Sequence, residues 1–414
     1  GVRDLLERIF ERHPDDFYEK SYTGWYCVGC EAIKQDSEIV DGHCVLHPSR
    51  TLEWVEERNW FFRLSAYGDR LRAHIASHPE FVQPESRRNE LLSLIDQGLE
   101  DVSSSRSRFS WGVPFPRPTS DGERQTTYVW FDALPNYWTA SRFPGSHASW
   151  PAQLHVIGKD ITRFHCLIWP AMLWAAELPL PERVWAHGFV QLGGERFSKS
   201  AGVKLELSEA VERYGSDAFR YFLLREVPFD ADGNFSWERF AERYTSDLAN
   251  GFGNLASRTI AMIQKYCESV VPRVDWAAVN AAAPWLASEQ REYRNAMDAL
   301  LLHEALAAAW RIVARANEYV DRQAPWKLAK DPARTQELHE TLAVLAWTLS
   351  HLALILAPFM PTKAQELWRQ LGGPGNVDER HWLGAGDDGA PPLDPSGWRV
   401  EKGPALFPRE IPAA

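Results

Sequence analysis

Three of the five cysteines fall within 18 residues, and this cluster constrains the N-terminal part of the chain more than any other feature. Cys27 and Cys30 are followed, after 13 residues, by Cys44 and His47. Two residues between ligands let a tight turn aim both side chains at one tetrahedral ion, and the spacer returns a second pair to it. We therefore expect a structural zinc site here, with His43 as a competing imidazole. Unrelated thiols beside a surface histidine are the alternative.

Composition limits the class of protein. The chain has 414 residues, enough for two to three domains, and carries a net charge of −11. Phosphate binding relies on clustered Lys and Arg, so this charge argues against nonspecific coating of nucleic acid but leaves room for a local basic face. The isolated Cys166 and Cys267 are expected to be buried thiols. No secretory leader opens the chain and the apolar run from Leu342 to Met360 is interrupted by polar residues, so we expect a buried helix and a cytoplasmic protein.

The predicted secondary structure changes along the chain. Residues 1–125 read as short strands and turns around the cysteine cluster. From 126 onward strand and helix patterns alternate, which predicts a parallel sheet. The predicted strands are 126–131, 154–157 and 184–190. After Ser208 the pattern is mainly helical, with a helix-like segment over 211–224 and apolar residues at three- and four-residue steps over 296–320 and 338–358.

A basic, serine-containing loop follows the last predicted strand. Phosphoryl and adenylyl transfer need cations where negative charge builds on the phosphates, on a loop that closes over the nucleotide. Taken alone, an exposed turn is the commoner explanation of such a segment. The loop reads Arg196-Phe197-Ser198-Lys199-Ser200.

Two sets of residues have helical spacing and aromatic character. The first is Trp130, Ala133 and Tyr137, and the second is Ile161, His165 and Trp169. If each set lines one helix face, together they make an aromatic pocket with a single polar group. An unbranched thioether suits such walls. Periodicity alone favours the simpler explanation that both are ordinary core.

A third set lies in the helical part. Asn254 and Arg258 are one helical turn apart, and an amide and a guanidinium at that spacing can read base edges in a single-stranded loop. Trp326 follows a proline and can stack on an extruded base. Without further context, the first two describe a solvated helix face and the third a buried anchor.

The loop and the segment that follows it resemble class I aminoacyl-tRNA synthetases. Their second signature, Lys-Met-Ser-Lys-Ser, matches residues 196–200, with Arg196 and Phe197 in place of Lys and Met. Their Tyr-Gly-x-Asp-Ala-x-Arg-Tyr segment matches Tyr214 to Tyr221. Replacing Lys by Arg keeps the positive charge but changes its geometry.

The blocks at 128–133 and 155–170 are similar to those of the methionyl-tRNA synthetase family. That resemblance implies that the two aromatic sets surround a methionine side chain and that Gly158 and Asp160 lie beside ATP. It implies that Arg106 contacts the reacting groups. The same resemblance implies that the loop residues Arg196, Ser198, Lys199 and Ser200 contact the phosphates. It also implies that the third set reads a CAU anticodon.

The resemblance implies the second half of a class I Rossmann-type catalytic domain with a zinc-knuckle insertion, followed by an α-helical anticodon-binding domain. The expected boundaries are 1–125 for the insertion, 126–236 for the catalytic half, 237–370 for the anticodon domain and 371–414 for a tail that packs back. The implied activity is ATP-dependent ligation of methionine to its cognate tRNA through methionyl-adenylate. It implies Mg²⁺ with ATP, and the zinc pattern fits the family's insertion. Since no appended tRNA-binding or dimerising domain follows residues 406–408, we expect a monomer.

The first class I signature, His-x-Gly-His, does not occur in the sequence. We therefore expect an N-terminally incomplete chain that forms little or no adenylate by itself. Two alternatives remain open: a sibling class I synthetase for isoleucine, valine, leucine or cysteine, and a noncatalytic tRNA-binding or zinc-scaffold protein derived from a synthetase.

Overall fold

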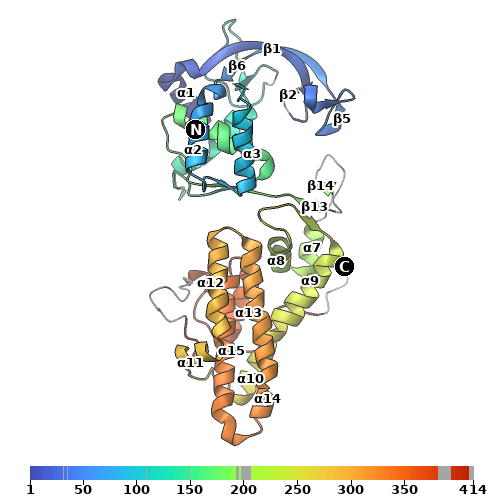
Figure 1. The fold of residues 1–414 in the computed structure, drawn as a ribbon, viewed down its shortest axis with the longest axis vertical. Helices are drawn as coiled ribbons and strands as arrows, with labels where there is room; N and C mark the ends of the chain where they lie inside the picture. Colours follow the sequence, from blue (N-terminus) through green and yellow to red (C-terminus); the bar gives the residue numbers. More distant parts are fainter. Residues whose placement is uncertain are drawn as a thin grey trace. The chain divides into compact units, whose positions relative to one another are not determined.

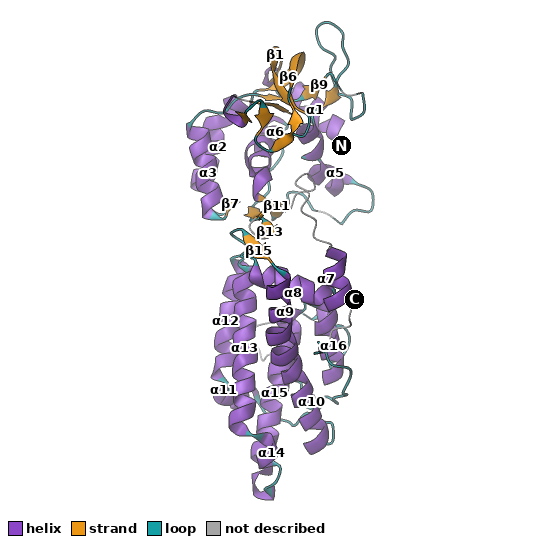
Figure 2. Cartoon of the chain, turned by 90° about the vertical axis from the view of Figure 1, so that its right-hand side faces the viewer, coloured by secondary structure: helices purple, strands orange, loops and turns teal. Residues whose placement is uncertain are grey.

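The computed structural model describes residues 1–30, 32–34, 36–108, 110–147, 149–192, 195–196, 207–380 and 393–409. The chain divides into two compact units, Gly1–His187 and Gly188–Ala414 (Figure 1). The first unit mixes strands and helices, whereas the second is mostly helical (Figure 2). The four domain ranges expected from the sequence stay predictions.

A long antiparallel ribbon organises the first unit. Strands β1 (Phe17–Cys27) and β6 (Glu53–Phe62) pair along their length, and β2 (Ala32–Lys34) and β8 (Val102–Ser103) flank them in the order β2-β1-β6-β8. A small sheet of β3 (Ile39–Val40), β4 (His43–Cys44) and β5 (His47–Thr51) lies between β2 and β6 in the chain. The ribbon carries this cysteine-containing sheet at one end (Figure 1).

The expectation of only short strands and turns before residue 125 is wrong. This region contains α1 (Val2–Arg12), α2 (Gly68–Ser77) and α3 (Glu85–Asp96), and its two main strands are long. The helices form because their apolar residues fall on one face: Leu5, Leu6 and Ile9 of α1 are fully buried in the core of this unit.

The predicted parallel sheet is present, with corrections. Strands β11 (His155–Gly158), β12 (Val184–His187) and β7 (Val82–Gln83) run parallel in the order β11-β12-β7. The strand predicted over 184–190 is two strands, since β13 (Val190–Leu192) pairs with β15 (Gly233–Phe235) instead. Gly188 lies between β12 and β13 in the chain. A Cβ there would lie 2.0 Å from the carbonyl oxygen of Ala231, so only glycine permits the two backbone segments to approach this closely.

The strand predicted over 126–131 is also shorter than expected. Only β10 (Thr126–Thr127) is extended, and it pairs with β9 (Ser105–Arg106). Helix α4 (Val129–Ala133) follows, because burying Phe131 completely in the core outweighs the β-propensity of the sequence.

Helices dominate the second unit, whose remaining short strand is β14 (Glu195–Arg196). Two of the long helical windows are interrupted, at Gly215 with φ 84° and at Leu300 with φ 58°. The elements are α7 (Leu207–Tyr214), α8 (Ser216–Glu226), α9 (Trp237–Arg243), a π-helix (Tyr244–Gly253), α10 (Asn254–Tyr266), α11 (Trp276–Ala282), α12 (Pro284–Asp298), α13 (Leu302–Gln323), α14 (Pro325–Leu328), α15 (Thr335–Leu356) and α16 (Pro361–Leu371).

The most apolar helix is the centre of this unit. Among the described residues, Pro332–Leu356 is the only segment long and apolar enough to cross a membrane, and 89% of its most apolar window is buried inside the protein. A membrane-spanning helix would present that surface to lipid. The prediction of a buried core helix is therefore confirmed.

Candidate functional site

The cysteine cluster predicted from spacing comes together in three dimensions. The ligand atoms of Cys27, Cys30, Cys44 and His47 all lie within 4.8 Å of one another. The Cys30 sulfur is 3.6 Å from the Cys44 sulfur and 3.2 Å from Nδ1 of His47. His43 is exposed and its Nδ1 lies 3.3 Å from the carbonyl oxygen of Arg50, so His47 is the fourth member of the cluster.

Local backbone geometry explains how the cluster forms. Cys27 ends β1, and the amide of Cys30 donates to the carbonyl of Cys27 at 3.2 Å, which closes the turn between the first two ligands. A Cβ on Gly29 would lie 2.7 Å from the His47 ring, so glycine is required where the ring crosses the turn. Three thiols and an imidazole are the donor set of a closed tetrahedral site for a soft or borderline cation. Burial raises the pKa of the Cys30 thiol to about 12, and a bound divalent cation would displace that proton.

The two aromatic sets also converge, within the first unit. Tyr137 on α5 (Asn136–Arg142) donates its hydroxyl to Nε2 of His165 at 2.8 Å. The other ring nitrogen, Nδ1, lies 3.0 Å from the carbonyl oxygen of Ile161. A carbonyl oxygen only accepts, so Nδ1 carries the proton and Nε2 accepts from Tyr137. Burial lowers the pKa of His165, which keeps this ring neutral.

We call the converging residues the aromatic cup: Trp130, Ala133, Tyr137, Ile161, His165 and Trp169. The Trp130 ring centroid is 6.3 Å from that of His165, and the Tyr137 centroid is 6.4 Å from that of Trp169. The chain does not achieve this with two regular helices. The first set spans α4 and α5, separated at Leu134 and Pro135, and the second spans a 3-10 turn, a π-helix (Phe164–Ile168) and α6 (Trp169–Ala175).

Sequence reasoning missed two members of this neighbourhood. The Phe164 ring stacks on Trp130 with centroids 3.8 Å apart and planes within 8°. The His155 ring lies edge-on to Tyr137 at 4.1 Å, and burial, with a smaller contribution from the neighbouring His165, lowers its pKa to about 4. Both belong to the block 155–170 that carried the resemblance, but neither falls on the helical spacing used to choose the set.

The structure also describes the other residues predicted to contact ATP or the reacting groups, Arg106, Gly158 and Asp160. Arg106 is buried, with its guanidinium 3.9 Å from the Tyr128 ring centroid and Nη1 donating to Ser103 Oγ at 2.7 Å. Asp160 is exposed, and a Cβ on Gly158 would lie 2.7 Å from its Oδ1. Glycine therefore leaves the space that this carboxylate occupies.

Most of the predicted basic loop falls in a part of the chain that the structure does not describe. Ser198, Lys199 and Ser200 lie outside the described residues, and Arg196 is described only as backbone at the end of β14.

The third predicted set comes together in the second unit, on what we call the α10–α14 face: Asn254, Arg258 and Trp326. The Arg258 guanidinium lies 5.6 Å from the Trp326 ring centroid, and 38% of Trp326 is exposed. Asn254 is partly exposed one turn before Arg258 on α10. Sequence reasoning missed Asp321 on α13, whose carboxylate accepts from Arg258 at 3.0 Å and orients it beside the tryptophan.

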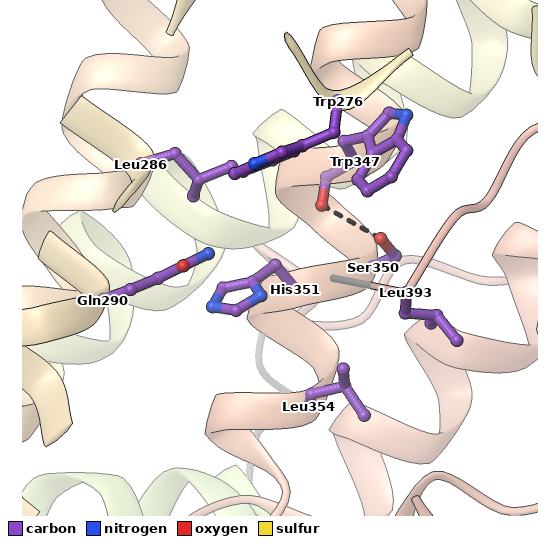
Figure 3. A pocket seen from close by; sticks show the side chains of 8 residues that line it. All are labelled: Trp276, Leu286, Gln290, Trp347, Ser350, His351, Leu354 and Leu393. Carbon is purple, nitrogen blue, oxygen red and sulfur yellow. Dashed lines mark hydrogen bonds between the residues drawn. The ribbon is translucent and has the colours of Figure 1, made fainter. Parts of the chain in front are cut away.

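Two cavities in the described part of the chain contain none of these residues. One, in the second unit, is too narrow to admit a water molecule between its lining side chains (Figure 3). It contains His351, whose pKa burial lowers to about 3. The other, of about 510 Å³, lies in the first unit between the end of α2 and the segment before β12. Their linings are Trp276, Leu286, Gln290, Trp347, Ser350, His351, Leu354 and Leu393, and His74, His78, Glu80, Phe81, Leu180, Pro181, Glu182 and Arg183.

Two known protein families match consecutive parts of this chain. Residues 14–260 match the family model described as tRNA synthetases class I (M). Residues 286–389 match the anticodon-binding domain of tRNA ligase. The fold is thus that of a class I synthetase catalytic domain joined to a helical anticodon-binding domain.

Individual relatives narrow the class. The methionine--tRNA ligase of Caldanaerobacter subterraneus is 43% identical over 99% of this chain, and that of Thermosynechococcus vestitus is 42% identical over 90%. The chain spans 63% of the length of the first and 71% of the second. The Mycobacterium tuberculosis methionyl-tRNA synthetase in complex with methionyl-adenylate superposes with a TM-score of 0.87 at 38% identity, over 99% of this chain and 80% of that one. The chain belongs to the methionyl-tRNA synthetase family.

Proposed function

We propose that the protein ligates methionine to a tRNA with a CAU anticodon in the cytoplasm, using ATP. The observation that carries this proposal is the aromatic cup, in which burial lowers the pKa of His165 and the Tyr137 hydroxyl donates to its ring. A neutral, apolar site accepts an unbranched thioether, because sulfur–aromatic contacts are favourable and no charge is left unpaired. The relatives' name and the methionyl-adenylate complex of the tuberculosis enzyme support the same substrate.

The reaction has two steps. A carboxylate oxygen of methionine bonds to the α-phosphorus of Mg²⁺-bound ATP, and pyrophosphate leaves. The terminal ribose hydroxyl of the tRNA then bonds to the methionyl carbonyl carbon, AMP leaves, and the hydroxyl proton passes to solvent or phosphate. No protein nucleophile takes part, so positioning and electrostatic stabilisation carry the catalysis.

Each predicted residue has a role in this proposal. Gly158 and Asp160 lie beside the nucleotide, Arg106 contacts the reacting groups, and Lys199 stabilises phosphate charge. Arg196, Ser198 and Ser200 complete the loop around Lys199. The α10–α14 face binds the anticodon, and the protein acts as a monomer.

Methionine-dependent exchange of pyrophosphate into ATP tests the function. It is measured on the chain alone and on the chain supplemented with the N-terminal part of a relative, with isoleucine, valine, leucine and cysteine as competing substrates. Exchange specific for methionine in either arm supports the proposal, and a first arm without exchange agrees with the predicted inactivity of the chain alone. Binding of tRNA without exchange in either arm would contradict the proposal and favour a noncatalytic tRNA-binding protein.

The metal is proposed to be Zn²⁺, bound by Cys27, Cys30, Cys44 and His47. When bound it links β1 to the β3–β4–β5 sheet and performs no chemistry. Elemental analysis should find one zinc per chain, lost in Cys44→Ser and kept in the matched control Cys267→Ser, whose thiol lies outside the cluster. Equal zinc in both variants would remove the assignment.

A further inference from the structure

The helix that carries Asn254 and Arg258 does not begin as an α-helix. Helix α9 continues into the π-helix Tyr244–Gly253, and α10 starts at Asn254 itself. The amide of Asn254 donates to the carbonyl of Ala249, five residues earlier. π-Helical turns are rare and tend to occur at functional sites, so this one needs a physical cause.

Two glycines permit the π-helix. A Cβ on Gly253 would lie 3.0 Å from the carbonyl oxygen of Leu248, and one on Gly251 would lie 3.2 Å from that of Ser246. Both distances are shorter than ordinary carbon–oxygen contacts. A side chain at either position would therefore require this turn to shift slightly to relieve the contact.

Contacts from outside the helix hold the same segment. Asn317 on α13 donates from Nδ2 to the carbonyl of Gly251 at 3.3 Å and to that of Val313, in its own helix, at 3.0 Å. At the other end of the π-helix, the Tyr244 hydroxyl donates to the carbonyl of Pro408 at 2.9 Å. Asp321, one turn after Asn317 on α13, holds Arg258. One face of α13 thus fixes both the π-helix and the guanidinium that follows it.

Helical geometry connects this lock to the α10–α14 face. Each residue of an α-helix turns the chain by about 100°. A π-turn contains one residue more than an α-turn, so converting it to an α-turn rotates all residues that follow by about that angle. Such a rotation would turn Asn254 away from the direction of Trp326. Asn317 contacts Gly251 without belonging to the face itself.

We propose that Asn317 is a positioning residue for anticodon specificity, which acts by holding the π-helix Tyr244–Gly253 and so sets the direction in which Asn254 and Arg258 point. This inference rests on the proposed function, in which the α10–α14 face reads the anticodon. Asn317 acts through Gly251 and touches no base.

The test uses binding of the full chain to anticodon stem-loop RNAs, which requires no catalysis. The RNAs share one stem and carry CAU, UAU or CGU in the anticodon. Asn317→Asp replaces the donating amide by a carboxylate that faces two carbonyl oxygens. It should weaken CAU binding by about tenfold, the size expected for a lost hydrogen bond that leaves a partly buried carbonyl unsatisfied, and lower the CAU-to-UAU affinity ratio towards one.

Matched variants isolate the mechanism. Asn295→Asp makes the same change of charge at an exposed site on α12 and should leave both the affinity and the ratio unchanged. Asn317→Gln keeps an amide donor and should recover most of the ratio. Gly253→Ala perturbs the same turn from its other side and should lower the ratio without removing Asn317; with Asn317→Ala it carries the test if Asn317→Asp does not fold.

The outcomes separate the two levels of the proposal. If the wild-type chain shows no preference for CAU, the proposed function of this face fails. If the wild type prefers CAU and the Asn317 and Gly253 variants lose affinity equally for all three loops, their role is general stability and the inference is overturned. An unchanged thermal unfolding temperature together with a lower ratio supports it.

Discussion

In the aromatic cup, His165 is 3% exposed and neutral, whereas on the α10–α14 face the Arg258 side chain is 33% exposed and charged. Both polar groups are oriented by one hydrogen bond from a neighbouring helix, Tyr137 in the first case and Asp321 in the second. Both lie near an aromatic ring at about the same separation, 6.3 Å for Trp130 and 5.6 Å for Trp326. The two sites differ in how far solvent reaches the polar side chain.

That difference matches the ligands we propose. An apolar thioether is selected by a site that excludes water and carries no charge, since a charge would cost desolvation energy without gaining a partner. A polyanionic RNA loop is selected by a site that keeps its cation hydrated until binding and offers a ring for stacking. The same kinds of side chain therefore serve opposite purposes because of burial, and pH and substitution should separate the two sites.

Acidification should give the largest effect on the first of these sites, through His155, whose ring packs against Tyr137 of the cup. Burial lowers the pKa of His155 from 6.5 to about 4, so the unfolded chain binds this proton first. The stabilisation is complete above pH 6.5 and is lost as the pH falls towards 4, by up to about 3 kcal/mol. Hydrogen exchange in β11 at a series of pH values measures this loss.

The control for acidification is His155→Phe, which keeps an aromatic ring against Tyr137 and removes the titrating group. It should flatten the pH dependence of exchange in β11. A slope unchanged by this substitution would show that another group causes it.

Trp326→Ala should come next, with an effect confined to the other site. Loss of one stacked base costs about 1–3 kcal/mol, or roughly 5- to 150-fold in tRNA affinity. Charging of the cognate tRNA should fall accordingly while methionine-dependent pyrophosphate exchange is unchanged. Unchanged tRNA charging would remove Trp326 from the anticodon site.

Tyr137→Phe should give a similar or somewhat smaller effect in the cup. The substitution leaves Nε2 of His165 buried without its donor, which costs about 1–3 kcal/mol. The KM for methionine should rise by about tenfold in the exchange assay, with stem-loop binding unaffected. The tyrosine Tyr293, whose hydroxyl donates to Ile355 in the second unit, provides the matched control Tyr293→Phe. An equal KM in both variants would contradict a role for the cup in methionine binding.

Arg258→Lys should have the smallest effect. Lysine keeps the positive charge but loses the planar guanidinium that packs near Trp326, a contact worth about 0.5–1 kcal/mol at an exposed site. A two- to fivefold loss of stem-loop affinity, by about that energy, is expected in a direct binding assay. A loss as large as that of Trp326→Ala would mean that Arg258 makes a specific bidentate contact with a base.

Features that depend on neighbours in the sequence were predictable. Cys27 and Cys30 share one turn, and Cys44 and His47 share another, so spacing alone identified all four members of the cluster. The buried helix α15 was equally clear, because its apolar residues cover more than one face over five turns or more. Long, regular periodicity and tight ligand spacing are both properties of local chain geometry.

Features that depend on irregular backbone were not. The cup was predicted as two regular helix faces, yet α4 and α5 are separated at Pro135 and His165 lies in a π-helix. The residues still meet, because burial of Phe131 and Trp169 in the core holds the short pieces in place. Phe164 and His155 fall off the helical spacing and so escaped a search based on it.

The sequence by itself predicted the four members of the cysteine cluster, the apolar helices and the candidate residues of the two proposed binding sites, since each is encoded by residue type and short-range spacing. Only the tertiary structure decided which tautomer His165 adopts, that Asp321 orients Arg258, and that Asn317 reaches Gly251 across 66 positions of the chain. Hydrogen bonds between distant segments depend on how helices pack, and packing is a property of the folded chain that no short window of sequence contains.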